Sequence, residues 1–265
     1  MGREETILNL IDSHAHLFLS EFDADLPAVI SRAHESGVTG IICAGVDIPS
    51  SRQAIALAGS YPAIFASVGI HPQSAVGTGK EDLDRLIEMA GMPRVVAIGE
   101  IGLDYYHGVS PPEVQRDIFE AQLKLAQKTA LPVVIHCRRA EEDLLEILGR
   151  WQGRVSGVIH CFSSAVEVAW RYFDLGFCIS LGAYLGYPTS GRLREDVSKL
   201  PLDMILLETD SPFLPPQQYR GRRNEPAYIT EVALLLANSY RVSPEKVAEE
   251  TSRNAARLFR FKLKG

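Results

Sequence analysis

The chain has 265 residues, of which 46% are hydrophobic and 23% are charged, and it carries a formal net charge of −6 with a pI of about 5.7. This composition is typical of a globular protein, and the acidic balance argues against tight, nonspecific binding of nucleic acid by the whole surface. A local basic patch remains compatible with it. No run of about 18 apolar residues is present, so we expect no membrane-spanning helix.

Short runs rich in β-branched residues alternate with amphipathic stretches of helical length along the chain. The predicted strands are residues 7–14, 39–46, 63–71, 94–103, 131–137, 155–162, 176–182 and 203–210. Helices are predicted between the strands at 23–36, 49–60, 80–90, 111–129, 140–150, 164–175 and 189–199. Two more are predicted after the last strand, at 226–239 and 244–259.

Several helix boundaries carry characteristic residues. Pro111 and Pro112 suit the first turn of a helix, and Ser243 followed by Pro244 is typical of an N-cap and the first helical position. Three glycines occupy positions where a helix is expected to end before the next strand, namely Gly37, Gly149 and Gly176.

The repeated alternation of strand and helix, with continuous apolar strands, predicts a parallel sheet covered by helices. Eight such units favour an α/β fold of the TIM-type (β/α)8 barrel class with an extra C-terminal helix. We expect one domain over residues 1–265. A doubly wound open sheet is the alternative.

The four cysteines, Cys43, Cys137, Cys161 and Cys178, include no C-x-x-C pair, which indicates reduced thiols in a cytoplasmic protein. Cys137 and Cys161 each follow a histidine directly. Because neighbouring residues of a strand point to opposite faces, we expect these two thiols to face the helices and the histidines to face the barrel mouth.

Ionisable side chains lie near the carboxyl ends of the predicted strands. In the stretch IDSHAHL, the spacing of two predicts that Asp12, His14 and His16 share one face of the first strand. Later strands end in further ionisable groups, namely Glu100, His136, His160 and Asp210. The carboxyl ends of barrel strands meet at one face, so we expect these groups to converge there.

A metal would hold such a set together. Four imidazoles and two carboxylates exceed the roughly three protein ligands of a catalytic zinc, and they suit two divalent cations with one carboxylate bridging them. A single histidine near a strand end is more often an ordinary core residue, but six coincidences at strand ends favour the metal. Sites of this type accept Mg²⁺, Mn²⁺ or Zn²⁺, so the ion stays open.

Eight stretches in order along the chain carry a family resemblance. They are DSHAHL (12–17), VGIHP (68–72), AIGEIGLDYY (97–106), PVVIHCR (132–138), IHCFS (159–163), LLETDSPFLPP (206–216), RGRRNEPAYI (220–229) and SRNAARLF (252–259). Together they resemble the TatD family of metal-dependent deoxyribonucleases, within the amidohydrolase-like barrels. The combination of G-E-x-G-L-D with E-T-D-S-P makes the resemblance highly specific.

The resemblance implies a division of the ligands between two ions. His14, His16, Glu100 and Asp210 would hold the first, and Glu100, as the bridge, would hold the second together with His136 and His160. It also implies a 3′-5′ exodeoxyribonuclease that hydrolyses phosphodiester bonds of DNA with a water activated by the two metals. Asp210 would orient that water or accept its proton, and His71 would contact the phosphate or assist the leaving group.

Further residues are expected to support the site. Arg222 and Arg223 follow the last strand and would contact phosphate, with Arg138 as a weaker candidate. Tyr105 and Tyr106 offer a stacking surface for a base or pack their loop. Two carboxylates are expected to hydrogen-bond the ligands, namely Glu208 and Asp12.

The expected partner is DNA, single-stranded or at a free 3′ end, bound weakly and with sensitivity to salt. No membrane partner is expected, and the monomer is the default state. Two other functions fit the same pattern. The metal site could hydrolyse a small-molecule ester or amide, in the manner of an amidohydrolase or phosphatase, because fold and metals do not fix the substrate. The barrel could also be a catalytically silent scaffold, which the intact ligand set argues against.

Overall fold

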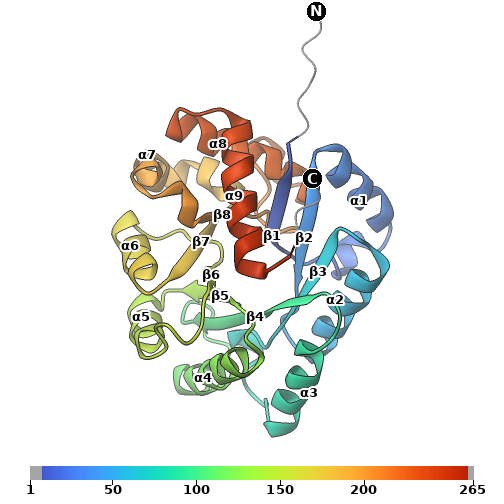
Figure 1. The fold of residues 1–265 in the computed structure, drawn as a ribbon, viewed down its shortest axis with the longest axis vertical. Coiled ribbons are helices and arrows are strands. Elements are labelled where there is room, and N and C mark those ends of the chain that lie inside the picture. Colours follow the sequence, from blue (N-terminus) through green and yellow to red (C-terminus); the bar gives the residue numbers. More distant parts are fainter. Residues whose placement is uncertain (1–7, 262–265) are drawn as a thin grey trace, which may run out of the picture.

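The computed structural model describes residues 8–261, and in it eight parallel strands form a nearly closed barrel surrounded by helices (Figure 1). The strands are β1 (Leu10–Ala15), β2 (Val38–Ala44), β3 (Ile64–Val68), β4 (Val95–Asp104), β5 (Val133–Arg138), β6 (Gly157–Ile159), β7 (Phe177–Leu181) and β8 (Ile205–Leu207). Their order around the barrel follows the sequence from β1 to β8. The predicted TIM-type barrel is confirmed, and the open sheet is excluded.

The helices lie close to their predicted positions. They are α1 (Leu26–Glu35), α2 (Ile48–Ser60), α3 (Lys80–Ala90), α4 (Pro112–Thr129), α5 (Glu141–Arg150), α6 (Val166–Asp174), α7 (Gly191–Asp196), α8 (Ile229–Tyr240) and α9 (Pro244–Phe259). α7 is shorter than predicted because 3₁₀ turns flank it on both sides. The predicted first strand began at residue 7, which lies outside the described residues. No helix among those described is long and apolar enough to cross a membrane.

The helix boundaries follow from the side chains that cap them. The Ser243 hydroxyl accepts a hydrogen bond from the backbone N–H of Lys246 at the start of α9, as predicted for an N-cap. Gly37 has a φ of 84° just beyond α1, where a left-handed residue satisfies the end of a helix. The prediction for Gly149 is wrong, because α5 continues through it to Arg150.

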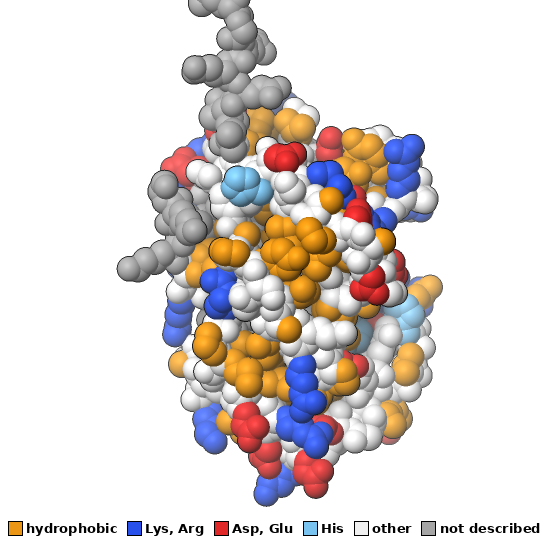
Figure 2. All heavy atoms as spheres, turned by 90° about the vertical axis from the view of Figure 1, so that its right-hand side faces the viewer, with side chains coloured by type: hydrophobic (Ala, Val, Ile, Leu, Met, Phe, Trp, Pro, Cys, Tyr) orange, Lys and Arg blue, Asp and Glu red, His pale blue; other side chains and the backbone are white. Residues whose placement is uncertain are grey.

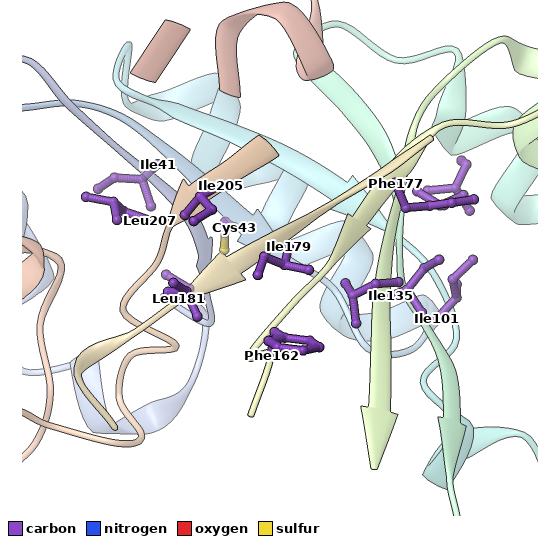
Figure 3. Close-up of a cluster of buried hydrophobic side chains, with 14 of the residues drawn as sticks. Ile41, Cys43, Ile101, Ile135, Phe162, Phe177, Ile179, Leu181, Ile205 and Leu207 are labelled. Carbon is purple, nitrogen blue, oxygen red and sulfur yellow. The ribbon is translucent and has the colours of Figure 1, made fainter. Parts of the chain in front are cut away.

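A large hydrophobic layer lies between the strands and the helices. Ile135 and Leu207 belong to it and are the sequence neighbours of His136 and Glu208, which alternation turns to the other face of the sheet. Figure 3 shows part of this layer, with residues such as Ile41, Ile101 and Ile179 gathered from several strands. This packing fixes the strands and therefore aims their polar neighbours inward.

A second, smaller cluster fills the barrel near the amino ends of the strands. It contains one residue from most strands, including Ile11, Val134, Val158, Cys178 and Leu206, together with Ala255 and Phe259 of α9. The predicted extra C-terminal helix is therefore present and closes this end of the barrel; it is the red helix α9 in Figure 1. The carboxyl ends of the strands stay open.

Asp12 closes the seam between β1 and β8. Its carboxylate accepts hydrogen bonds from the Thr209 backbone N–H (2.9 Å) and the Thr209 hydroxyl (2.5 Å). The register of β1 against β2 shifts between Asp12 and Ala15, and the extra residue reverses the alternation of side chains. The prediction that Asp12 shares a face with His14 and His16 is therefore wrong. Asp12 supports His14 only through its backbone N–H, at 3.3 Å.

We predict that Asp12→Ala lowers the free energy of unfolding by roughly 2–4 kcal/mol, because two buried donors of Thr209 lose their acceptor. Urea denaturation followed by circular dichroism measures this difference. Thr209→Val is the matched control and should cost less, since it removes the hydroxyl and keeps the backbone bond. An Asp12→Ala protein as stable as the wild type would show that the carboxylate does not hold the seam.

Candidate metal centre

The six predicted ligands meet at the open end of the barrel. They come from five strands or the residues just after them: His14 from β1 and His16 directly after it, Glu100 from the middle of β4, His136 from β5, His160 from the residue after β6, and Asp210 from three residues after β8. Most of them line a pocket of about 550 Å³, in which side chains of the loops after the strands form the walls.

The Glu100 carboxylate lies at the centre of this group, buried, with its two oxygens facing different histidines. Oε1 lies 2.9 Å from His136 Nδ1 and 2.8 Å from His160 Nε2. Oε2 lies 3.4 Å from His14 Nε2 and 3.6 Å from His16 Nε2. One carboxylate thus divides the imidazoles into two pairs.

Asp210 lies on the side of the first pair. Its Oδ1 is 3.8 Å from His14 Nε2 and 3.5 Å from His16 Nε2. Three overlapping trios place their ligand atoms within 4.8 Å of one another: His14 with His160 and Asp210, His14 with His16 and Glu100, and His71 with Glu100 and His136. The structure therefore brings all six predicted ligands together.

The donor atoms fit divalent cations. His14 Nε2 and His16 Nε2 lie 3.0 Å apart, and His136 Nδ1 and His160 Nε2 lie 3.3 Å apart. Ring nitrogens this close, each facing a carboxylate, form the nitrogen and oxygen donor set that first-row divalent metals prefer. The buried Nδ1 atoms of His14 and His160 and the buried Nε2 of His136 have no hydrogen-bond partner among the described residues.

Hydrogen bonds to the outer nitrogens select the tautomers. His16 Nδ1 lies 2.9 Å from the Ala44 carbonyl oxygen, to which it donates, so its Nε2 keeps a lone pair for a metal. His71 has the opposite arrangement. Its Nδ1 accepts from the Gln73 backbone N–H at 3.1 Å, so Nε2 carries the hydrogen and faces Glu100 Oε1 at 3.3 Å. His71 is therefore built as a donor rather than a ligand.

The groups around Glu100 keep its carboxylate ionised. Burial alone would raise the pKa of Glu100, but the imidazoles of His160 and His71 and the hydrogen bonds from His136 and His14 hold that pKa well below its usual range. Burial would lower the pKa of His160, yet the Glu100 carboxylate raises it to about 9. The same negative charge that retains a proton on His160 attracts a cation in its place.

Asp104 is a buried carboxylate that sequence reasoning missed. Its Oδ2 lies 3.3 Å from His136 Nε2, on the side of the ring away from Glu100. It also accepts hydrogen bonds from the Gln73 side chain (3.0 Å) and the backbone N–H of His107 (3.0 Å). The Asp104 carboxylate and the His136 ring form no hydrogen bond among the described residues, but a negative charge this close to Nε2 favours the tautomer with its hydrogen on that nitrogen, which leaves a lone pair on Nδ1. Asp104 follows Glu100 at an even spacing on the same strand, which is the signal that would have identified it.

The expected hydrogen bond between Glu208 and a predicted ligand is not formed among the described residues, although its carboxylate lies near His160. It lies 3.8 Å from His160 Nδ1 and accepts from the Ser180 hydroxyl and from the Cys161 backbone N–H. The prediction that the Cys161 thiol faces the helices is wrong. Cys161 has a left-handed backbone conformation, with a φ of 51°, and it lines the pocket. Cys137 packs against the outer layer and accepts a hydrogen bond from the Tyr172 hydroxyl, as predicted.

The two arginines after β8 do not line the pocket. The Arg223 guanidinium pairs with Asp25 at 2.7 and 2.9 Å and with Glu225 at 3.1 Å, which conflicts with its predicted contact to phosphate. Arg222 is exposed in the same loop, and its phosphate contact stays a prediction. Arg138 lines the pocket instead.

Comparison with known proteins gives a consistent result. The model of the family described as TatD related DNase matches residues 11–260. The chain is 39% identical over 95% of its length to an uncharacterised metal-dependent hydrolase, YabD, of Bacillus subtilis, of which it covers 99%. It is 33% identical to the protein named 3′-5′ ssDNA/RNA exonuclease TatD of Citrobacter rodentium, over 96% of this chain and 99% of that protein.

Solved structures agree with the sequence comparison. The crystal structure of YjjV, a TatD homologue from Escherichia coli, superposes with a TM-score of 0.91 at 32% identity and covers 97% of this chain and 100% of that chain. The fold as a whole therefore has a close structural counterpart.

We predict that Asp104→Asn weakens Mn²⁺ binding by about 10–100-fold, because His136 loses the negative charge that favours the tautomer with a lone pair on Nδ1. Isothermal titration calorimetry measures the affinity without reference to turnover. Gln73→Ala is the control, since Gln73 contacts Asp104 but not His136, and it should bind Mn²⁺ nearly as the wild type does. Equal affinities for Asp104→Asn and wild type would exclude this role of Asp104.

Proposed function

The chain belongs to the TatD-related DNase family of metal-dependent hydrolases, and from that premise we propose that it removes nucleotides from the 3′ end of single-stranded DNA. The observation that carries the proposal is the position of Glu100, whose two oxygens face two separate pairs of imidazoles. This is the geometry that a bridge between two cations requires. A two-metal site suits in-line displacement at phosphorus.

The proposed ligand sets follow from the contacts. His14, His16, Asp210 and Oε2 of Glu100 would hold one divalent ion, and His136, His160 and Oε1 of Glu100 would hold the other. When bound, such a pair lowers the pKa of water and neutralises negative charge on the phosphate oxygens. The physiological ion is proposed to be Mg²⁺, Mn²⁺ or Zn²⁺.

Asp210 is proposed as the residue that takes the proton of the attacking water. Burial opposes its ionisation, but the neighbouring imidazoles of His16 and His14 lower its pKa, so it is ionised and able to accept. The water oxygen forms a bond to phosphorus, and the bond from phosphorus to the 3′ oxygen of the preceding nucleotide breaks. His71 Nε2–H donates to an oxygen of the phosphate or to this leaving oxygen.

The pocket supports a substrate of nucleotide size. Its volume of about 550 Å³ lies within the range of roughly 300–1,000 Å³ usual for ligand sites. A base can enter only when it is unpaired, which favours single strands and free ends. On an acidic protein the binding is proposed to be weak and salt-sensitive, in a monomer, with Arg222 as an additional phosphate contact beyond the pocket.

We predict that the metal-stripped chain does not degrade single-stranded oligonucleotides carrying a 5′ label, and that added Mg²⁺ or Mn²⁺ restores successive shortening from the 3′ end. Electrophoresis of the labelled products gives both the rate and the polarity. A preparation that leaves DNA intact with every metal but hydrolyses cyclic amides or small phosphate esters would support the small-molecule alternative instead.

His71→Ala separates metal binding from catalysis. We predict that it lowers kcat on a single-stranded oligonucleotide by about 100–1,000-fold, since one donor to the transition state is lost. The bound Mn²⁺, counted by atomic emission after dialysis, should stay at the wild-type number because His71 is not a ligand. His136→Ala is the comparison and should lose metal as well as activity. Loss of metal in His71→Ala would contradict the assignment of His71 as a donor.

A further inference from the structure

A cluster of one tyrosine and two arginines stands at the rim of the pocket, and we call Tyr106, Arg138 and Arg139 the rim cluster. The guanidinium carbons of Arg138 and Arg139 lie 4.5 and 4.7 Å from the centre of the Tyr106 ring. The ring is 48% exposed, and both arginines are exposed. Arg138 and His107 line the pocket itself, so the cluster continues the pocket wall outward.

The two arginines have no carboxylate partner, a property that they share with several other arginines of the described residues. Arg116, Arg171 and Arg223 each pair with a carboxylate, whereas Arg138 and Arg139 form no ion pair within residues 8–261. Figure 2 shows the face that carries α1, α2 and α3, where Lys and Arg side chains are interspersed with Asp and Glu. The rim cluster therefore presents a local positive charge on an acidic chain.

The loop that carries Tyr106 is held by the same carboxylate that lies beside His136 of the metal site. Asp104 accepts hydrogen bonds from the backbone N–H groups of Tyr106 and His107, both at 3.0 Å. The His107 ring packs edge-on against Tyr106, with ring centres 4.9 Å apart. Tyr105 instead donates to Asp143 and packs the loop. The position of the rim cluster is thus fixed relative to His136.

The opposite wall of the pocket is apolar. It consists of Phe18 and Leu19 after β1 and Phe213 and Leu214 after β8. β8 and β1 lie across the barrel from β4 and β5, whose loops carry the rim cluster (Figure 1). The Phe213 ring is 49% exposed and lies 6.0 Å from the His16 ring. The metal centre thus has a cationic, aromatic side and an apolar side.

We propose that this asymmetry sets the direction in which a DNA strand crosses the site, an inference that rests on the proposed function. Beyond the scissile phosphate, the 3′-terminal nucleoside carries no further phosphate and fits the apolar wall, with its base against Phe213. The remaining strand carries a phosphate at every nucleotide and fits the rim cluster. Arg138 and Arg139, held over the Tyr106 ring, contact the next phosphates of this strand.

The test compares two substrates that differ in their number of phosphates. The dinucleoside monophosphate dTpdT has only the scissile phosphate, whereas an oligothymidylate of about ten residues has phosphates on the side of the rim cluster. The double variant Arg138→Gln, Arg139→Gln should lower kcat/KM on the oligonucleotide by about ten-fold or more. It should change kcat/KM on dTpdT by no more than about two-fold. Because each phosphate contact on a single strand contributes about 0.7 to the salt slope, the slope of log KM against log salt should fall by about 1.4.

Single substitutions distinguish the contributions of the two pocket walls to cleavage. Tyr106→Ala should lower kcat/KM selectively on the oligonucleotide, by about five-fold or more. Phe213→Ala should lower kcat/KM on both substrates. Arg154→Gln is the matched control, because Arg154 also lies over an aromatic ring, that of Trp151 at 5.9 Å, but in the connection from α5 to β6 at the other end of the barrel. It should behave as the wild type.

The outcomes are distinguishable. If the wild-type chain cleaves neither substrate with Mn²⁺ present, the proposed function fails and this inference fails with it. If the wild type cleaves the oligonucleotide and the arginine double variant matches it, only the assignment of the rim cluster is overturned. An equal loss on dTpdT and on the oligonucleotide would also overturn it, because the cluster would then act on the metal site rather than on the strand.

Discussion

The structure depends on one buried carboxylate that is surrounded by imidazoles. Glu100 is almost fully buried and contacts ring nitrogens of five histidines through its two oxygens. Placing a charge there costs several kcal/mol unless opposite charge or hydrogen-bond donors lie close by, and the surrounding imidazoles supply them. The barrel tolerates this cost because its hydrophobic layers fix every strand independently of the site.

Groups beyond the rings act on some of the imidazoles, whereas His14 Nδ1 has no partner among the described residues. Asp104 stands behind His136, Glu208 stands near His160, and the Ala44 carbonyl holds His16. The Gln73 backbone N–H donates to His71 Nδ1, so the Nε2 of His71 presents a hydrogen to the site instead of a lone pair. Chemically similar side chains thus divide into ligands and a donor according to what lies behind the ring.

Much of this could be predicted from the sequence, and the failures have physical causes. The period of the strands and helices, and the convergence of strand ends, were enough to identify the six residues that meet at the open end of the barrel. Asp12 was misplaced because a bulge in β1 reverses the alternation, and no residue type announces such a bulge. Arg223 was assigned to phosphate because its partner Asp25 lies 198 residues away in the sequence. Asp104 was overlooked although its spacing from Glu100 was visible.

The most direct test of the account is a crystal of the chain soaked in Mn²⁺, with anomalous diffraction used to locate the ions. The account predicts two peaks roughly 3.5–4 Å apart, one on each side of the Glu100 carboxylate, with His14 and His16 at one and His136 and His160 at the other. A single peak, or two peaks that Glu100 does not join, would contradict it.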